Sequence, residues 1–198
     1  MAWAVLGAIL FVGLFDQTSA SFIPAYADIR ARYQADAEFA AAVQREVSAG
    51  GMIFQLPYLA FPEHAPFGDL RDYEPFRAYL HSKALRWSYG ATKGRPEADW
   101  QQRVTSTDPA QSLAGLVGLG FEGILMDTYN YDDGGAAAMA SLVPILGQPT
   151  IVGGPEGRFR FWDLRGYQEQ AGLSDAAVRD AARALVGPLL ARLPARGG

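Results

Sequence analysis

The chain has 198 residues and a formal net charge of -4, with no cysteine and two histidines. Hydrophobic residues make up 49% and charged residues 19% of it, which is typical of one globular domain with a sizeable core. The acidic balance argues against a nucleic-acid partner, because phosphate binding needs a basic face. Without cysteine there is no disulfide, thiolate zinc site or cysteine nucleophile, and two histidines leave little room for a metal site. We therefore predict no metal and no cofactor.

The first fifteen residues, Met1 to Phe15, carry no charged side chain. As a helix they would be about 22 Å long, which is shorter than the ~30 Å hydrocarbon core of a bilayer. The segment could be the end of a transmembrane helix, a signal-peptide core or a buried element. It lacks a basic n-region, and the flank from Asp16 is poor in Lys and Arg, which favours the non-cytoplasmic side. We expect residues 1–15 to end a membrane helix and residues 16–198 to form a single extracytoplasmic α/β domain.

The elements expected next begin with a helix from about Ala27 to Val47, where apolar residues recur at helical spacing. A buried strand, Gly51 to Leu59, follows, with Pro57 limiting it. After a proline-rich loop, the pattern predicts a short helix over residues 72–82 and a strand from Ala84 to Ala91. A further helix is expected around residues 97–104.

The second half alternates strands and helices more clearly. The pattern predicts helices over 110–119, 136–146 and 175–193, a strand over 120–127, and a late hairpin formed by PTIVGG and RFRFWDL. Asp108-Pro109 would begin the first of these helices and Ser174 would cap the last. The fold class predicted is α/β, with a partly parallel sheet flanked by helices. Ligands of such sheets bind beyond the carboxyl ends of the strands, which selects residues 55–58, 89–93 and 127–133.

Carboxylates gather after the strand that ends in Asp127. Tyr131, Asp132 and Asp133 follow it in the sequence GFEGILMDTYNYDD. Paired carboxylates can cleave glycosides or bind a hard cation. In the alternative interpretation, Asp132 or Asp133 simply caps the following helix.

The segment from residue 80 to residue 95 interleaves cations with aromatic side chains. It contains His81, Arg86, Trp87, Tyr89 and Lys93. Aromatic faces suit a sugar, while Arg and Lys can hold phosphate or carboxylate, so this segment fits an anionic or sugar ligand. Alternatively, Arg86 pairs with a buried acid, Trp87 fills the core and His81 forms structural hydrogen bonds.

A third candidate group lies in FQLPYLAFPEH. Gln55 lies at a strand end, and Glu63 and His64 lie in a proline-rich loop that could face the same crevice. Glu63 could act as a general acid or base if buried, whereas in a plain loop it would be solvated. The sequence contains no GxSxG elbow, P-loop, GxGxxG or HExxH motif.

Four segments together resemble a known family: FQLPYLAFPE, DYEPFRAYLHSKALRWSYGATKGR, DWQQRV and LGFEGILMDTYNYDD. They are similar to the C-terminal extracytoplasmic domain of bacterial polytopic membrane proteins described as sugar-transferase-like, sugar-translocase-like or sulfatase-like. The resemblance covers roughly Asp16 to Leu164. It implies a glycan or lipid-linked sugar as the partner, on the periplasmic side of the inner membrane, but no reaction. The catalytic acid of polyprenyl-phosphate-sugar transferases lies in an early extracytoplasmic loop that has no counterpart here.

Three functions follow as hypotheses. The first is an accessory domain of a membrane sugar-transferase-like protein, held at the membrane by residues 1–15 and not catalytic alone. Its expected binding residues are Gln55, His81, Arg86, Trp87, Tyr89, Lys93, Tyr131 and Asp133. The second is a stand-alone α/β hydrolase acting on glycosidic or ester bonds, with Asp127 and Glu63 as its acid–base pair. The third is a structural or partner-binding domain whose aromatic side chains are core residues.

Overall fold

The structure is a computed structural model that describes residues 1–17, 23–63 and 73–190. The chain divides into two compact units, Met1–Tyr33 and Gln34–Gly198. The second unit holds the sheet and both hydrophobic cores, so it contains every candidate residue named above that the structure describes. His64 lies outside the described residues.

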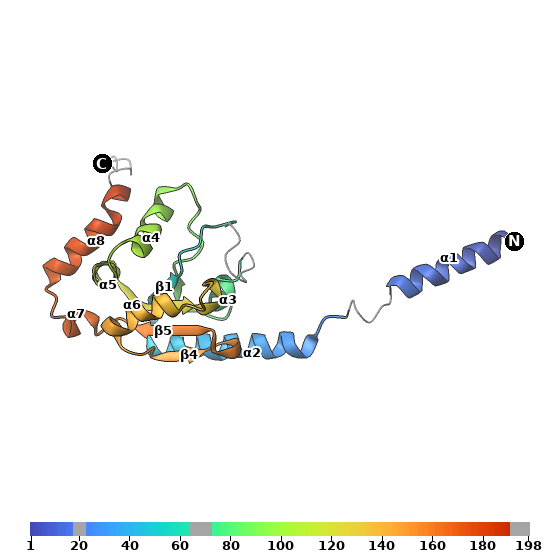
Figure 1. The fold of residues 1–198 in the computed structure, drawn as a ribbon, viewed down its shortest axis with the longest axis horizontal. Coiled ribbons are helices and arrows are strands. Elements are labelled where there is room, and N and C mark those ends of the chain that lie inside the picture. Colours follow the sequence, from blue (N-terminus) through green and yellow to red (C-terminus); the bar gives the residue numbers. More distant parts are fainter. Residues whose placement is uncertain (18–22, 64–72, 191–198) are drawn as a thin grey trace. The chain divides into compact units, whose positions relative to one another are not determined.

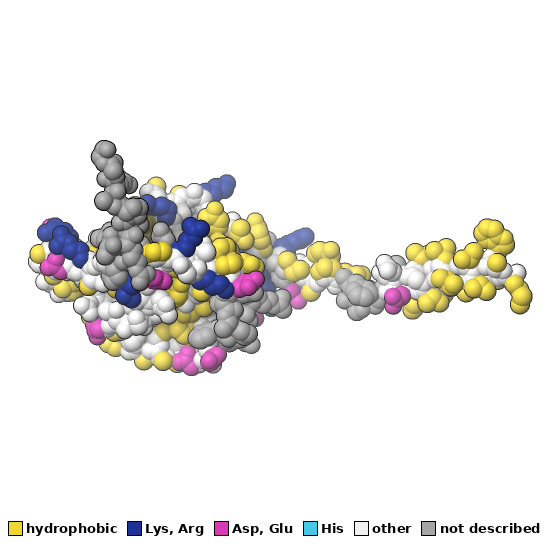
Figure 2. Space-filling view, turned by 90° about the horizontal axis from the view of Figure 1, so that it is seen from above, with side chains coloured by type: hydrophobic (Ala, Val, Ile, Leu, Met, Phe, Trp, Pro, Cys, Tyr) yellow, Lys and Arg dark blue, Asp and Glu magenta, His cyan; other side chains and the backbone are white. Residues whose placement is uncertain are grey.

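The first unit contains helix α1, Ala2–Gln17, and the start of α2, Tyr26–Glu46. Every residue of α1 is exposed, and hydrophobic side chains cover the face of it seen in Figure 2. Its 16 residues make a helix about 24 Å long. Across the described parts of the chain, we find no helix whose length and apolar character together would suffice for a bilayer crossing. The helix is therefore present, and its membrane role stays a prediction.

The second unit is built on a five-stranded mixed sheet with the order β2-β1-β3-β5-β4 (Figure 1). Strands β1, Met52–Leu56, β2, Arg86–Trp87, and β3, Phe121–Asp127, are parallel. Strand β5, Phe159–Asp163, runs antiparallel to both β3 and β4, Ile151–Gly153. The predicted α/β class, the partly parallel sheet and the late hairpin are confirmed.

One strand is much shorter than the sequence pattern predicts. The alternation over residues 84–91 predicts eight residues, but β2 has two. The backbone ladder ends with the Ser88 amide, which donates to the Ile53 carbonyl at 3.0 Å, and side chains replace it from there, since the Gln55 amide donates to Ser88 Oγ at 2.8 Å. The Tyr89 amide in turn donates to Gln55 Oε1 at 3.1 Å. These two bonds turn the chain away from the sheet at its carboxyl edge.

One face of the sheet packs against five helices. They are α4, Pro96–Ser106, α5, Pro109–Gly118, α6, Ala136–Leu146, α7, Tyr167–Gln170, and α8, Asp175–Leu190. The core on this face is made of Phe54, Val104, Leu113, Ala114, Leu116, Ile124, Met126, Leu142, Trp162, Leu164, Tyr167 and Leu185. Figure 1 shows α6 beside β5, and Leu142 of α6 and Trp162 of β5 both belong to this core.

The opposite face packs against α2 and α3, Phe76–Leu80. Its core is made of Phe39, Val43, Val47, Ile53, Ala78, Leu85, Leu125, Phe159 and Phe161. Neighbouring residues along β3 point to opposite faces, so Ile124 and Leu125 belong to different cores. Both faces of the sheet are thus covered by helices.

The predicted helix starts are confirmed at two positions. Asp108 accepts a hydrogen bond from the Gln111 amide at 3.1 Å, with Pro109 at the first position of α5. Ser174 Oγ accepts from the Ala177 amide at 3.2 Å at the start of α8. These caps satisfy amides that have no partner inside the helix.

Candidate functional site

The carboxyl ends of β1, β2 and β3 meet at one edge of the sheet, and the antiparallel β5 begins there. A narrow recess lies at this edge, with a free volume of about 20 Å³. That is room for about one water molecule. Its polar lining consists of Gln55, Tyr58, Glu74, Ser88, Tyr89, Gln101, Asp127 and Asn130.

An ion pair between Asp127 and Arg158 lies at the base of this edge. Arg158 Nε donates to Asp127 Oδ1 at 2.8 Å, and Arg158 Nη2 donates to Asp127 Oδ2. Asp127 and Arg158 are both buried, at 5% and 6% exposure. The register explains the contact, because Asp127, the last residue of β3, lies opposite Phe159, the first residue of β5. Two parallel hydrogen bonds fix the orientation of the carboxylate and compensate its charge.

The pair belongs to a longer row of alternating charges. Arg158 Nη1 also contacts Glu74 Oε2 at 3.0 Å, and Glu74 contacts Arg77 at 3.4 Å. Arg77 Nη2 then reaches Asp36 Oδ2 of α2 at 2.5 Å. This charge ladder, Asp36, Arg77, Glu74, Arg158 and Asp127, has three carboxylates and two guanidinium groups. It therefore carries one net negative charge, and both of its cations are engaged by acids.

Burial dominates the protonation of the pair. It raises the pKa of Asp127, while the hydrogen bonds and charge of Arg158 act in the opposite direction. Burial also works against the charge of Arg158, but Asp127 and Glu74 outweigh it, so the pKa of Arg158 is raised. The guanidinium thus stays charged, and Asp127 depends on it for compensation.

Gln55 ties the elements around the recess together. Its Nε2 donates to the Pro75 carbonyl at 2.8 Å, in the turn before α3. Its Oε1 accepts from the Tyr89 amide, and its own amide donates to Ser88 Oγ. The side chain lies in the recess as predicted, but its polar atoms already hold the neighbouring loops in place.

Asn130 is a lining residue of the recess whose side-chain oxygen is an unused acceptor. The residue is 2% exposed and lies in a short 3-10 turn directly after β3, Thr128–Asn130. Its Oδ1 has no hydrogen-bond partner among the residues that the structure describes. A buried amide oxygen left without a partner costs about 1–3 kcal/mol. A ligand hydroxyl that donates to Asn130 would remove this cost.

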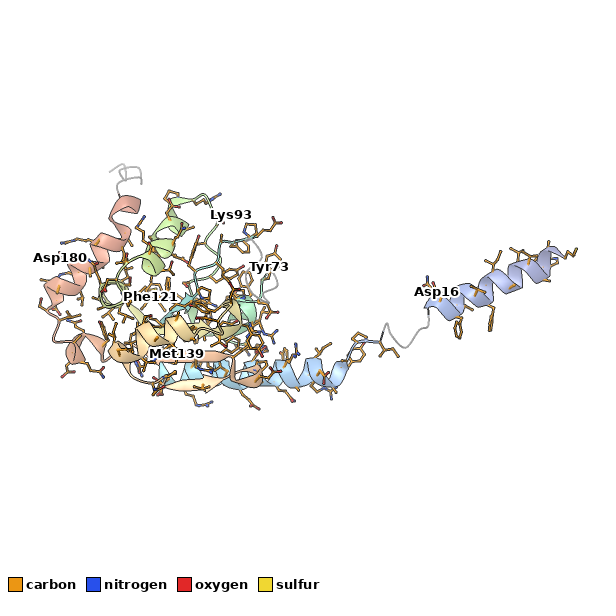
Figure 3. All side chains as sticks on the ribbon, in the orientation of Figure 1. Asp16, Tyr73, Lys93, Phe121, Met139 and Asp180 are labelled. Carbon is orange, nitrogen blue, oxygen red and sulfur yellow. The ribbon has the colours of Figure 1, made fainter. Side chains whose placement is uncertain are left out.

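An aromatic cluster, Phe61, Tyr73, Phe76, Tyr79 and Tyr89, adjoins the recess. Its ring centroids are 4.8 to 6.2 Å apart, mostly edge to face. Tyr89 belongs to both the cluster and the recess lining. Tyr73 and Tyr79 are 48% and 54% exposed, and the outward side chain of Tyr73 is labelled in Figure 3. The recess therefore has an exposed aromatic surface beside it.

Three residues predicted as site residues meet at the recess: Gln55, Tyr89 and Asp127. Arg86 does not, because it lies at the amino end of β2, exposed, and donates to the Gly50 carbonyl at 2.7 Å. Trp87 packs on the α2 side of the sheet and donates to Ser82 Oγ at 2.6 Å. Arg86 and Trp87 therefore do not join Gln55, Tyr89 and Asp127 at the recess.

The residues of the proline-rich loop also lie elsewhere. Lys93 Nζ donates to the Glu63 carbonyl at 2.8 Å, and both side chains are exposed. Neither residue lines the recess, so Gln55 and Glu63 do not meet there. His81 follows α3 as its C-cap residue, away from the recess lining.

The two remaining candidates serve α6 and its core. Tyr131 packs against the core on the α5 side, where burial raises the pKa of its hydroxyl. Asp133 Oδ1 accepts from the Gly135 amide and Oδ2 from the Ala137 amide, both at 2.8 Å. The alternative interpretation of Asp133, a cap for the helix that begins at Ala136, is confirmed.

Replacing Asp133 with alanine is expected to lower the melting temperature at pH 7 and much less at about pH 2. The amides of Ala137 and Gly135 lower the pKa of Asp133 in the folded state. A lowered folded pKa stabilises the fold above the unfolded value of about 3.9, and this contribution is lost as the pH falls through the folded pKa. Asp132→Ala, at an exposed neighbour, is the control in thermal melts at both pH values. An equal loss at both would contradict the capping role.

Sequence reasoning missed Arg158, Glu74, Asn130, Ser88 and Gln101. Arg158 begins the segment expected to pair with PTIVGG, and nothing in the sequence indicated that this segment also pairs with the strand that ends in Asp127. Glu74 and Gln101 reach the recess from a turn and a helix, so only the tertiary fold brings them there.

Comparison of the chain with protein-family models, with curated proteins and with solved structures found no significant match in any of the three.

Proposed function

We propose that the domain binds a carbohydrate at the recess and is not catalytic on its own. The observation that carries this proposal is the unused acceptor of Asn130, a residue that lines a space the size of one water molecule. A hydroxyl group is the ligand fragment of that size that can donate a hydrogen bond. The adjoining aromatic cluster then supports the rest of the sugar ring, because aromatic faces pack against apolar ligand surfaces.

The charges favour a neutral sugar over an anion. Both guanidinium groups of the charge ladder are held by carboxylates, and the ladder keeps a net negative charge. The exposed cations Arg86 and Lys93 do not line the recess. Phosphate or sulfate would therefore meet acceptors and acids, whereas hydroxyl groups find partners to which they can donate.

The same geometry makes hydrolysis the weaker candidate. A glycosidase needs one carboxylic acid that donates a proton and a second carboxylate at a defined separation. Asp127 is held by two hydrogen bonds from Arg158, and Glu74 shares the same guanidinium group. Glu63, the predicted partner of Asp127, is exposed and lies outside the recess lining.

The wider setting belongs to the same proposal. Helix α1 is apolar on all sides from Ala2 to Phe15 and fully exposed, which is the composition of a membrane-inserted helix. Together with the resemblance noted in the sequence, this supports an accessory domain of a membrane sugar-transferase-like protein. In that setting the domain lies on the periplasmic side of the inner membrane, and α1 is the end of a membrane helix.

Replacing Asn130 with leucine is expected to weaken sugar binding about tenfold, since one hydrogen bond to a buried acceptor is lost. The melting temperature should hold or rise, because an unsatisfied polar group leaves the interior. A glycan array identifies the oligosaccharide that binds best, and calorimetric titration of the variants measures the change.

Arg86→Ala is the matched control, because Arg86 lies at the opposite end of its strand. It should leave sugar binding unchanged. A chain that binds no glycan on the array, or one that loses binding with Arg86→Ala but keeps it with Asn130→Leu, would contradict the proposed site.

A further inference from the structure

A second pocket, of about 260 Å³, lies between the sheet and helices α4, α5 and α6. It shares Leu56 and Pro57 with the recess, at the end of β1. Its walls include Val104, Leu113, Leu116, Ile124 and Leu142. By the measure used for the recess, in which about 20 Å³ holds one water molecule, the pocket has room for roughly a dozen water-sized groups.

The lining of this pocket is uncharged. None of the described residues that line it is an acid, a lysine, an arginine or a histidine. Two of its hydroxyls are already used, because Ser112 Oγ donates to the Val104 carbonyl at 2.9 Å and Ser141 Oγ to the Ala138 carbonyl at 2.8 Å. A polar or ionic ligand would therefore lose its hydration here and gain few hydrogen bonds in exchange. A hydrocarbon has no such hydration to lose.

We propose that this pocket binds the hydrocarbon chain of an amphiphile whose sugar places one hydroxyl in the recess. The inference rests on the proposed function and names its ligand class, a lipid-linked sugar. Leu56 and Pro57 line both sites and so form the junction between them. The recess offers polar acceptors, and the adjoining pocket is apolar. One molecule that fills both sites gains from the high effective concentration of its second half.

The chain length of the ligand gives the first test. Each buried methylene group strengthens binding roughly fourfold, so n-decanol should bind the full chain about 15-fold tighter than n-octanol. The gain should level off once the pocket is full. Geraniol, an isoprenoid alcohol with ten carbons, distinguishes a prenyl chain from a straight acyl-type chain. Tighter binding of either alcohol supports the pocket and identifies the chain type.

Pocket-filling variants give the second test. Ala138→Phe places a ring in the pocket from α6 and should weaken n-decanol binding at least tenfold. Ala140→Phe is the matched control, because Ala140 is an exposed residue of the same helix outside the lining. Thr105→Phe fills the pocket from α4 and serves if the Ala138 variant does not fold. Both control and filled variants keep α1, so alcohol bound to that helix affects them equally.

The outcomes separate this inference from the proposed function. Ala138→Phe should leave binding of a lipid-free oligosaccharide unchanged. Asn130→Leu should weaken binding of the oligosaccharide and leave binding of n-decanol unchanged. Saturable alcohol binding that depends on Ala138 and not on Ala140 supports the pocket. Absence of saturable binding, or equal weakening by both phenylalanine variants, overturns it, while oligosaccharide binding would still support the recess.

Discussion

Arg158→Met is expected to lower the free energy of unfolding by about 3–5 kcal/mol, the usual result of breaking a buried ion pair from one side. Arg158 is 6% exposed and compensates both Asp127 and Glu74. Without the guanidinium, Asp127 stays buried at a site that already raises its pKa. Urea denaturation at pH 7 measures the loss.

The double variant Asp127→Leu with Arg158→Met separates the pair from general damage. Replacing both partners by apolar groups often restores or improves stability, so the double variant should be clearly more stable than Arg158→Met alone. Arg183→Met is the control, because Arg183 and its partner Asp180 are 72% and 71% exposed. Its effect should stay within about 0.5 kcal/mol. Equal, small losses in Arg158→Met and Arg183→Met would contradict a structural role for the pair.

The second large effect concerns membrane binding by α1. The full chain should float with phosphatidylethanolamine–phosphatidylglycerol vesicles in a density gradient. Large apolar side chains stay exposed along the helix, and burying each one contributes about 1.5–3 kcal/mol. Because no charged side chain precedes Asp16, the binding should depend only weakly on salt concentration.

Leu6→Asp combined with Leu10→Asp should abolish flotation. Each charge placed in a membrane helix costs about 2.5–3.5 kcal/mol, so two weaken partitioning by at least roughly a thousandfold. The matched control, Leu6→Ala with Leu10→Ala, keeps the helix uncharged and should still float. A full chain that stays at the bottom of the gradient, or that floats equally well with both aspartates, would contradict the membrane role of α1.

Local signals explain which elements the sequence predicted well. Asp108-Pro109 and Ser174 mark helix starts through short-range hydrogen bonds, and the structure has both caps. The helix over residues 136–146 matches α6 at both ends. The predicted length of β2 was wrong because it depends on Gln55, more than thirty residues away along the chain. Hydrogen bonds of Gln55 replace the strand ladder there.

The site was predictable only in part for the same reason. Asp127 was found from its place at the end of an apolar strand, and Asp133 was ambiguous because a cap and a ligand carboxylate look alike in sequence. Arg158, by contrast, meets Asp127 through the antiparallel register of β5 on β3. Arg86, like Arg158, is an arginine at the start of a strand. Because β2 runs parallel to β1, however, its start lies at the amino edge of the sheet, away from the ligand site.

The central claim, that a sugar hydroxyl enters the recess and donates to Asn130, is tested most directly by a structure of the full chain with the oligosaccharide selected on the array. We predict a sugar hydroxyl within hydrogen-bond distance of Asn130 Oδ1, with the sugar ring against the aromatic cluster. The same oligosaccharide bound at the amino edge of the sheet beside Arg86, with the recess unchanged, would contradict the account.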